Sequence, residues 1–599
     1  MNQMKTLMPQ RIFNSNTCRI LFATCLSALC LAALSAEAAT ITVINTLDGG
    51  PGSLRQALAD ANDGDTINFD ASLHAIGVFS GELVVDKSVT ISGPGPGAAN
   101  LFVYNDGLNR VFHITNAVTV SISGLTITNG LADDRGGGGI LNDHSTLTVS
   151  NCTIRGNQTV YADTSGGAIY NDGESGSASL EINNSTVVYN GCDDRGGGIY
   201  NNGISGSATL TINNSSVSGN FVGNAGGGIY NDGYQGSATL TINNSTLSDN
   251  SAVYAGSAGG GIVNTGSSGG SATLTVRNST LSDNSADFYG GGIENEGIGG
   301  SAMLTVTNCT ISGNSVGDYG GGIHNVGGLF GGATLTVTNS TISGNSAAGY
   351  AGGIFNDGHF GEGATLEIGN TILKTGSSGA NIYNPEGIVT SLGYNLCNDE
   401  GNGFLTATGD QINTDPLLGP LQDNGGPTFT HKLLGGSPAI DAGDSNFNPN
   451  SFNPPMVYDQ RGTGFNRVVN GRIDIGAFEV QAVPSPYAGQ VQQPINADGS
   501  SVFSVRRGVV PVKFTLSQGG VATCALPPAT IAVTRTAGGT TGQIDESVYS
   551  GSADTGSNFR ISNCQYIYNL SASALGVGTY RVDIKINGTV VGSGIFQLK

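Results

Sequence analysis

A Gly-rich cluster followed by Ile, any residue and Asn recurs nine times between residues 136 and 384 of this 599-residue chain. A repeat of about 30 residues is one supersecondary unit that cannot bury its own apolar face and becomes stable by stacking on its neighbours. The chain is therefore expected to form a solenoid. Successive copies lie 28 to 33 residues apart, with isoleucines at Ile140, Ile169, Ile199, Ile229, Ile262, Ile293, Ile323, Ile354 and Ile382.

A second phrase runs between the clusters and is clearest at Ala208–Asn220 and Ala238–Asn250. Within it Ala208, Leu210 and Ile212 alternate with threonine, which is the period of a half-buried strand. Each copy predicts three short strands separated by polar corners. This pattern favours an all-β, right-handed parallel β-helix of the pectate-lyase-like kind with roughly ten coils, because a propeller blade needs four antiparallel strands in a longer repeat. The signature of a leucine-rich repeat is absent.

Asparagine recurs at two corners of each copy. Its amide can bond to the coils above and below, and its backbone tolerates the left-handed region. We therefore expect structural asparagine ladders rather than a ligand site. We expect the glycines to serve turns. The two rows are Asn157, Asn190, Asn220, Asn250, Asn284, Asn314 and Asn345, and Asn201, Asn231, Asn264, Asn295, Asn325 and Asn356.

Residues 1–38 have the features of a secretory signal peptide. Lys5, Arg11 and Arg19 precede an apolar stretch, and Ala36-Glu37-Ala38 provides a small-x-small cleavage site. No other segment is predicted to cross a membrane. The protein is thus expected to be exported, either to the extracellular space or to the outer cell surface. Its formal charge of −21 repels phosphate backbones and excludes nucleic acid as a partner.

The rest of the chain divides into a solenoid and a tail. The β-helix is expected over 39–480, with an N-terminal cap (39–70) whose short helix is capped by Ser53, and a C-terminal closing segment (385–480). A Pro-containing linker (481–489) follows. Residues 490–599 predict an Ig-like β-sandwich, with strands near Val510–Leu516, Thr530–Thr536 and Thr579–Ile586.

Six cysteines lie beyond the signal segment. Cys524 and Cys564 share the tail and are the predicted disulfide, given an oxidising compartment. Cys152 and Cys309 replace a repeated serine and are expected to be small buried residues. Cys192 and Cys397 have no predicted role.

Several motifs resemble those of exported bacterial right-handed β-helix proteins. Thr40–Phe69, with Gly52-Ser53-Leu54-Arg55, resembles a CSLREA-type start, and Asp415–Pro427 resembles a choice-of-anchor Q closing segment. The Gly-Gly-Gly-Ile-x-Asn repeats resemble those of polymorphic outer-membrane proteins. Pro511-Val512-Lys513-Phe514 is similar to the PxKF domain, an immunoglobulin-like module. The resemblance implies a surface or secreted protein and assigns no reaction.

Carboxylates beside arginines provide one candidate for chemistry. Asp133-Asp134-Arg135 is echoed by Asp193-Asp194-Arg195 two coils later, and stacking would bring these side chains to one edge. Polysaccharide lyases and hydrolases need clustered acids of this kind. The alternative is a set of solvated ion pairs duplicated with the repeat.

Aromatic side chains provide the second candidate, at the variable position of Ile-x-Asn. An exposed ladder there could stack on sugar rings or contact a protein, unless neighbouring loops cover it. Glu294 and His324 are adjacent members, close enough for acid–base work or for an ordinary cross-strand pair. The ladder's predicted binding residues are Tyr170, Tyr200, Tyr230, His324, Phe355 and Tyr383.

Two weaker hypotheses concern ions and ice. Asp441, Asp444, Asp459 and Asp474 of the closing segment could bind Ca²⁺, although their spacing fits no fixed loop. Outward Thr-x-Thr pairs such as Thr209/Thr211 form an array that an ice-binding protein could use, but threonine also simply suits a solvated strand.

These observations favour a non-catalytic, monomeric adhesion protein whose β-helix presents a rigid face to an extracellular glycan or protein. The alternative function is a polysaccharide lyase or glycoside hydrolase that uses the acids at the Asp133/Asp193 edge. No cofactor is predicted beyond the Ca²⁺ hypothesis.

Overall fold

The computed structural model describes residues 38–94, 101–161, 163–328, 330–360, 363–481, 487–506, 508–518, 520–538, 551–586 and 588–599. The predicted signal peptide, apart from its last residue, lies outside this set. The chain divides into two compact units between Gln481 and Ala482. No helix in the described ranges is long and apolar enough to cross a membrane.

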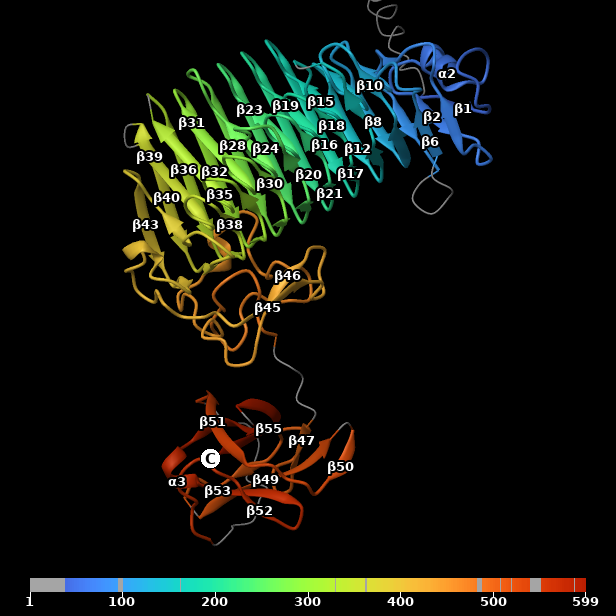
Figure 1. The fold of residues 1–599 in the computed structure, drawn as a ribbon. Coiled ribbons are helices and arrows are strands. Elements are labelled where there is room, and N and C mark those ends of the chain that lie inside the picture. Colours follow the sequence, from blue (N-terminus) through green and yellow to red (C-terminus); the bar gives the residue numbers. More distant parts are fainter. Residues whose placement is uncertain are drawn as a thin grey trace, which may run out of the picture. The chain divides into compact units, whose positions relative to one another are not determined.

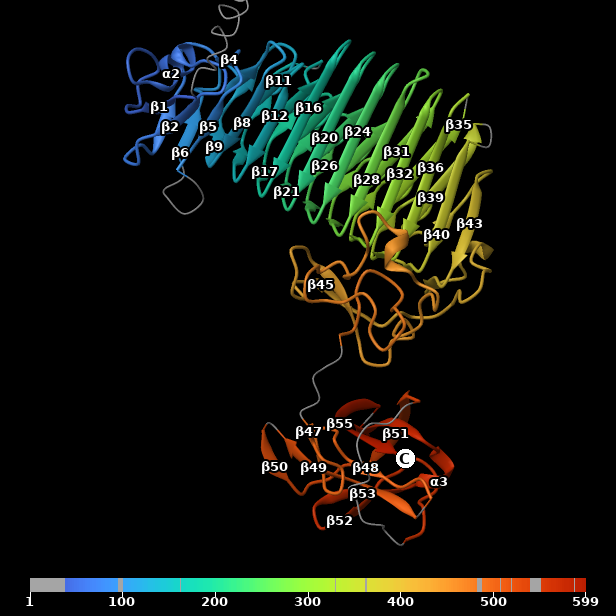
Figure 2. The ribbon, with the colours of Figure 1, turned by 180° about the vertical axis from the view of Figure 1, so that it is seen from behind.

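The first unit is a parallel β-helix, as predicted, and its coils stack side by side along the solenoid (Figures 1 and 2). The first sheet carries the Ala-Thr-Leu-Thr-Ile phrase, with Ala208, Leu210 and Ile212 buried and the threonines turned outward. In the described residues it has 13 strands: β1 (Thr40–Val43), β2 (Thr66–Phe69), β5 (Thr90–Ser92), β8 (Thr119–Ser123), β12 (Thr146–Ser150), β16 (Ser177–Asn183), β20 (Ser207–Asn213), β24 (Ser237–Asn243), β28 (Ser271–Arg277), β32 (Ser301–Thr307), β36 (Gly332–Thr338), β40 (Ala364–Gly369) and β43 (Ile388–Gly393).

The second sheet follows after an asparagine corner. Asn214 turns this corner in the left-handed region with φ 49°, and equivalent asparagines do so in other coils. The sheet's described strands are β3 (Ala75–Gly77), β6 (Leu101–Tyr104), β9 (Leu125–Thr128), β13 (Thr153–Arg155), β17 (Thr186–Val188), β21 (Ser216–Ser218), β25 (Thr246–Ser248), β29 (Thr280–Ser282), β33 (Thr310–Ser312), β37 (Thr341–Ser343), β41 (Ile372–Lys374) and β44 (Leu396–Cys397).

The third sheet carries the Ile-x-Asn motif and positions the candidate site described below. Its isoleucines are fully buried from Ile140 to Ile382. The strands pair in register along the described chain: β4 (Leu83–Val85), β7 (Phe112–Ile114), β11 (Ile140–Asp143), β15 (Ile169–Asp172), β19 (Ile199–Asn202), β23 (Ile229–Asp232), β27 (Ile262–Thr265), β31 (Ile293–Ile298), β35 (Ile323–Gly328), β39 (Ile354–Phe360) and β42 (Ile382–Tyr383).

A fourth sheet of two-residue strands is an addition to the three strands per coil that we predicted. It starts directly after the Asn220-type corner, and its inward residues form a separate apolar row that includes Cys192, Val222 and Ala252. Two-residue strands are too short for an alternating pattern to reveal them in the sequence. The strands are β10 (Leu131–Ala132), β14 (Gln158–Thr159), β18 (Gly191–Cys192), β22 (Phe221–Val222), β26 (Ser251–Ala252), β30 (Ser285–Ala286), β34 (Ser315–Val316) and β38 (Ser346–Ala347).

Both predicted asparagine ladders are confirmed. Asn220 Nδ2 donates to Asn250 Oδ1 at 3.0 Å, and Asn201 Nδ2 donates to Asn231 Oδ1 at 2.6 Å. Some glycines serve this packing rather than a turn: a Cβ on Gly228 would lie 3.2 Å from the Asn250 side chain and 2.7 Å from the carbonyl oxygen of Gly261. The ladders satisfy buried amide groups at every coil, which explains the recurrence of both residue types.

The two ends of the solenoid are covered differently. At the start, Ser53 caps α2 (Leu54–Asp60), as predicted, by accepting the Gln56 N–H, and Leu54, Ala57 and Leu58 are buried. At the other end, Leu405 joins the core just after η1 (Gly401–Gly403).

Most of the closing segment lies along the side of the β-helix rather than across its end. Residues 418–480 lie along the second sheet, where Thr280 donates to the Phe429 carbonyl (2.6 Å) and Ser312 Oγ lies 2.9 Å from His431 Nε2. The outward Thr and Ser side chains of β29 and β33 are consequently buried, unlike those of earlier coils. This segment contains β45 (Leu418–Gln422), β46 (Thr430–Leu433) and η2 (Pro449–Ser451).

The second unit contains two sheets that share one hydrophobic core. Among the described strands of this unit, pairing is antiparallel except between β48 and β55, and a disulfide joins Cys524 to Cys564. Residues 487–489, which we assigned to the linker, belong to the first strand. The described elements are β47 (Tyr487–Gln492), β48 (Val502–Phe503), β49 (Val509–Gln518), β50 (Val521–Thr523), β51 (Ala529–Ala537), β52 (Arg560–Ser562), β53 (Gln565–Ser571), α3 (Ala572–Leu575), β54 (Gly578–Ile586) and β55 (Thr589–Leu598).

Candidate functional site

The first half of the aromatic ladder is not the exposed surface that we predicted, although Tyr230 at its end borders the groove described below. Tyr170, Tyr200 and Tyr230 pair in register on β15, β19 and β23, with only 7, 3 and 8% of their surfaces exposed. Their rings meet edge to face, with centroids 4.9 and 5.6 Å apart. Loop residues that include Ala225 pack over them. The alternative stated above, that neighbouring loops cover these rings, holds here.

The arginines of the two Asp-Asp-Arg repeats form ion pairs with aspartates of the third sheet. Arg135 Nη1 lies 3.3 Å from Asp172 Oδ2, and Arg195 Nη1 lies 3.2 Å from Asp232 Oδ2; both aspartates are buried. Each arginine thus neutralises an acid one coil further on, which supports a structural role.

The neighbouring acids do not converge on a shared site. Asp134 pairs with Arg110, Asp193 accepts the Tyr254 hydroxyl at 3.2 Å, and Asp194 accepts the Asn224 amide at 3.2 Å. Asp133 is exposed. The paired carboxylates that the lyase or hydrolase hypothesis required at this edge are therefore not brought together.

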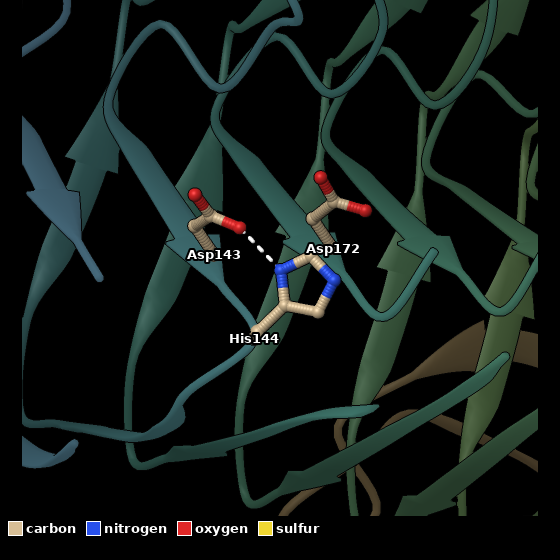
Figure 3. Close-up of side chains that lie close together, drawn as sticks. All are labelled: Asp143, His144 and Asp172. Atoms are coloured by element: carbon tan, nitrogen blue, oxygen red, sulfur yellow. Dashed lines mark hydrogen bonds and ion pairs between the residues drawn. The ribbon is translucent and has the colours of Figure 1, made fainter. Parts of the chain in front are cut away.

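One cluster with metal-ligand chemistry lies nearby and was not predicted. Asp143, His144 and Asp172 place one ligand atom each within 4.8 Å of the others (Figure 3). His144 Nδ1 bonds to Asp143, its Nε2 lies 2.7 Å from the Glu174 carbonyl oxygen, and Arg135 faces Asp172. Burial raises the pKa of Asp172. Because each of these groups already has a protein partner and a guanidinium lies alongside, the cluster is better suited to bracing the coil than to binding a cation.

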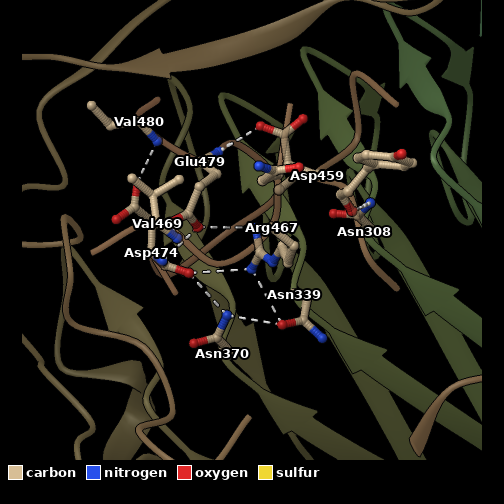
Figure 4. A network of polar contacts seen from close by, with 12 residues as sticks. Asn308, Asn339, Asn370, Asp459, Arg467, Val469, Asp474, Glu479 and Val480 are labelled. Atoms are coloured by element: carbon tan, nitrogen blue, oxygen red, sulfur yellow. Dashed lines mark hydrogen bonds and ion pairs between the residues drawn. The ribbon is translucent and has the colours of Figure 1, made fainter. Parts of the chain in front are cut away.

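Of the four acids proposed for Ca²⁺ binding, Asp459 and Asp474 are occupied by protein donors (Figure 4). Asp441 and Asp444 accept from Asn470 Nδ2 (3.4 Å) and from the Asn446 N–H (2.9 Å). Asp459 accepts from Arg461 Nη2 at 2.5 Å and from the Glu479 N–H at 2.8 Å. Asp474 accepts the N–H groups of Asp441 (2.7 Å) and Val480 (2.6 Å). These bonds anchor the closing segment.

Arg467 and Glu479 complete that anchor as a fully buried pair (Figure 4). Arg467 Nη2 donates to the Asn339 side chain at 3.2 Å, and its Nη1 lies 4.0 Å from Glu479 Oε2. Burial raises the pKa of Glu479 to about 8, against the lowering effect of the arginine. The arrangement ties the closing segment to the β-helix.

The second half of the third sheet forms a groove. It has a volume of about 830 Å³, and its floor includes Val263, Glu294, His324, Phe355 and Tyr383, the later members of the predicted aromatic ladder. These side chains come from β27, β31, β35, β39 and β42 in turn. A second cavity, of about 620 Å³, lies where the closing segment meets the coils and is lined largely by loop residues such as Pro454 and Pro455. The groove is the stronger candidate site because aromatic rings, carboxylates and a buried histidine line it together.

A row of loop tyrosines forms one wall of this groove. Tyr289, Tyr319 and Tyr350 pair in register, and their rings stack at 5.6 and 5.7 Å with interplanar angles of 17° and 5°. Tyr350 is 46% exposed. We did not predict this row, although its signal is visible: each tyrosine stands directly, or one residue, before a Gly cluster. Flat aromatic faces at a coil-to-coil spacing suit the apolar faces of sugar rings.

A buried histidine pair lies at the centre of the floor. His324 Nδ1 lies 2.8 Å from Glu294 Oε2, and the imidazole stacks on Tyr289 at 5.3 Å. The pairing of Glu294 with His324 that we predicted is confirmed, but the pair is buried rather than on an open surface. Nε2 makes no hydrogen bond, and Asp357 Oδ2 lies 3.8 Å away. Burial opposes protonation, yet the charges of Glu294 and Asp357 raise the pKa of His324 to about 9.

Acidic groups outnumber basic ones in the groove. Burial and the charge of Glu294 raise the pKa of Glu296. Despite its partial burial, Asp357 has a lowered pKa, because it faces His324 and His359. No lysine or arginine is among the described residues that line the groove. The site therefore combines aromatic faces, acceptors and a histidine donor.

The other sequence-predicted features lie elsewhere. The outward threonines of the first sheet align, but Met303, 51% exposed, interrupts the row. Cys192 donates to the Arg195 carbonyl at 3.2 Å and Cys397 to Asp399 Oδ1 at 2.9 Å; both are buried, as are Cys152 and Cys309. Neither feature contributes a residue to the groove.

No protein-family model matches the chain, and no curated protein matches it.

Proposed function

We propose that the protein is an exported surface or secreted protein whose β-helix binds a glycan in the groove without catalysing a reaction. The observation that carries this proposal is the stacked row Tyr289, Tyr319 and Tyr350 beside a floor of hydrogen-bonding side chains. Export is supported by the character of residues 1–38, and a surface role by the resemblance of the repeats to those of exported β-helix proteins.

The chemistry of the groove fits a carbohydrate better than a flat protein surface. The C–H faces of a sugar ring can stack on the tyrosines, while its hydroxyls need both donors and acceptors. Asp357 and the unpaired Nε2 of His324 are 3.8 Å apart, so one hydroxyl could accept from the imidazole and donate to the carboxylate. A purely apolar protein contact would leave these groups unsatisfied.

The proposal is tested with residues 39–599 and a panel of polysaccharides, following bound protein and polysaccharide chain length together. Tyr319→Ala and Tyr350→Ala are expected to weaken binding about 30-fold each, because they remove an aromatic contact at the centre of the interface. Tyr189→Ala, at a tyrosine that is 70% exposed and does not line the groove, is the matched control. Affinity unchanged in both groove variants, with thermal midpoints also unchanged, would remove the groove from the function.

A hydrolase remains the second candidate, for one reason. Glu294 and Glu296 share the groove, and the pKa of Glu296 is raised, which is how a glycosidase separates its acid from its base. The residues concerned are therefore not those of the Asp133/Asp193 edge. Shortening of a polysaccharide by the wild-type chain, abolished in Glu296→Gln, would establish this reaction and overturn the non-catalytic proposal.

A further inference from the structure

The repeat provides an internal comparison for what fits beside the acids of the groove. Arg195, Ala225, Ala258, Tyr289, Tyr319 and Tyr350 occupy one column, each bridged to the next. A second column on the third sheet runs through Asp232, Thr265, Glu296, Val326 and Asp357. Similar surroundings thus recur from coil to coil with different side chains.

In the earlier coils the protein supplies its own cation to this place. The Arg195 guanidinium lies 5.2 Å from the centre of the Tyr230 ring and 3.2 Å from the Asp232 carboxylate. Aromatic faces and carboxylates together attract a cation more strongly than either does alone. The chain therefore shows that an acid of the second column accommodates a positive charge supplied from the first column.

Two coils later the acid recurs without the arginine, but the ring does not recur at its own position. Glu294 takes the register position of Tyr230, and Tyr289 is instead the next member of the Ala258 column. Ala258 occupies the column position of Arg195, Glu296 that of Asp232, and all three of Ala258, Glu296 and Tyr289 line the groove. Ala258 precedes Glu296 by 38 residues, as Arg195 precedes Asp232 by 37. No side-chain cation from the described lining residues reaches Glu296 except His324, which Glu294 already holds.

A second observation points independently to a ligand. His324 is 2% exposed, lines the groove, and has a ring nitrogen without a hydrogen-bond partner. Buried polar atoms of this kind are rare in folded proteins and are frequently satisfied by a bound molecule. The ligand must then offer a hydroxyl-type acceptor as well as a positive charge.

We propose that the groove binds a glycan that carries protonated primary amines, an amino sugar with its amino group free, with the ammonium group beside Glu296. This inference rests on the proposed function and names its ligand class. The sugar ring stacks on the tyrosine row, a ring hydroxyl accepts from His324, and the ammonium group pairs with Glu296 as the Arg195 guanidinium pairs with Asp232 two coils earlier.

The experiment compares two oligosaccharides that differ in one group. Chito-oligosaccharides of equal length, one fully N-acetylated and one fully deacetylated, are titrated against residues 39–599 by calorimetry at mildly acidic pH. The deacetylated form is expected to bind at least about tenfold more tightly, because it alone forms the charge-assisted contact. The preference is expected to shrink with added salt.

Variants locate the contact. Glu296→Gln preserves shape and is expected to abolish the preference by weakening binding of the deacetylated form to the level of the acetylated one. Tyr350→Ala is expected to weaken both forms equally. Glu181→Gln, which removes an exposed acid on β16, is the matched control for net charge and is expected to change neither.

The outcomes separate this inference from the function on which it rests. Equal binding of the two oligosaccharides, or tighter binding of the acetylated one, overturns the amine inference and leaves glycan binding standing. Binding of neither, together with no binding across the polysaccharide panel, overturns both. If Glu296→Gln still binds the deacetylated oligosaccharide more tightly, the ammonium group does not bind at Glu296 and the proposed location is wrong. Binding of an oligolysine, with no binding of either sugar, would show that the groove binds a basic peptide and would overturn the glycan proposal.

Discussion

The two halves of the third sheet have acids at the same register positions. In one half an arginine pairs with each of these acids, and in the other half no arginine among the described residues does. From β11 to β23, Asp172 and Asp232 are covered by Arg135 and Arg195, and tyrosine rings fill the space above the strands. From β27 to β42, Glu296 and Asp357 have no arginine, and the loop tyrosines leave a groove of about 830 Å³. The fold is unchanged between the halves. The difference lies in the loop column, where arginine gives way to tyrosine, and in the variable position of Ile-x-Asn, where tyrosine gives way to Val263, Glu294 and His324.

That difference distinguishes coils that stabilise the fold from coils that can bind a ligand, within the same repeat. A buried acid without a cation is costly, so a coil that serves only as scaffold is expected to neutralise it internally. A coil that binds a ligand can leave the acid for the ligand to neutralise. The raised pKa of Glu296 shows the cost: burial and the nearby Glu294 charge favour the protonated form.

The largest effect is expected from protonation of His324 in the groove half. Its pKa is about 9, above the ordinary 6.5. The protonated imidazole therefore stabilises the fold fully below about pH 6.5, and this contribution, on the order of 3 kcal/mol, is lost as the pH rises to about 9. Urea unfolding of residues 39–599 at several pH values between about 6.5 and 9 measures how steeply the free energy of unfolding falls with pH.

His324→Gln is expected to flatten that slope, because it removes the buried group that titrates. His144→Gln is the matched variant in the other half, where the imidazole is 37% exposed and water screens its pairing with Asp143. A slope reduced more by His144→Gln than by His324→Gln would contradict the assignment of the pH response to the groove.

The second effect tests the closed half. Arg195→Met leaves Asp232 buried beside an aromatic row with no cation, and is expected to lower the free energy of unfolding by about 2 kcal/mol. This is less than for a fully buried pair because the arginine side chain is 37% exposed. Arg155→Met, at an exposed position on β13, is expected to cost under about 0.5 kcal/mol. Equal losses in the two variants would show that the Arg195 pair does not stabilise the coil.

The architecture was predictable because one pattern is repeated nine times. Alternation at Ala208, Leu210 and Ile212 identified the strand faces, and the asparagine corners identified the ladders. Two features escaped prediction for different reasons. The fourth strands recur from coil to coil but are only two residues long, too short to show an alternating pattern. The closing segment is not repeated, and its Pro- and Gly-rich sequence does not reveal which surface it covers.

The site was predictable only in part. The register that places Glu294 beside His324 follows from the repeat, but burial does not, because it depends on loops that fold over the sheet. The same loops made Tyr200 a core residue and Phe355 part of the groove floor. Reading the residue before each Gly cluster as a column would have found Tyr289, Tyr319 and Tyr350, and with them the change from arginine to tyrosine that separates the halves.

The smallest effect on stability, and the sharpest test of the comparison, comes from converting one half into the other. Ala258→Arg places a guanidinium at the column position of Arg195, with Glu296 in the place of Asp232. The new pair is expected to raise the free energy of unfolding by up to about 1 kcal/mol and to lower the pKa of Glu296. Binding of the deacetylated oligosaccharide is expected to fall at least about tenfold, since the protein then supplies the cation itself.

Ala258→Met separates charge from bulk in this experiment, because the side chain reaches into the same space without a positive group. If methionine abolishes binding as fully as arginine does, the groove is sensitive to volume there and the charge argument fails. If arginine alone abolishes the preference for the free amine, while methionine preserves it, then one loop residue per coil decides whether this β-helix stabilises its own acids or offers them to a ligand.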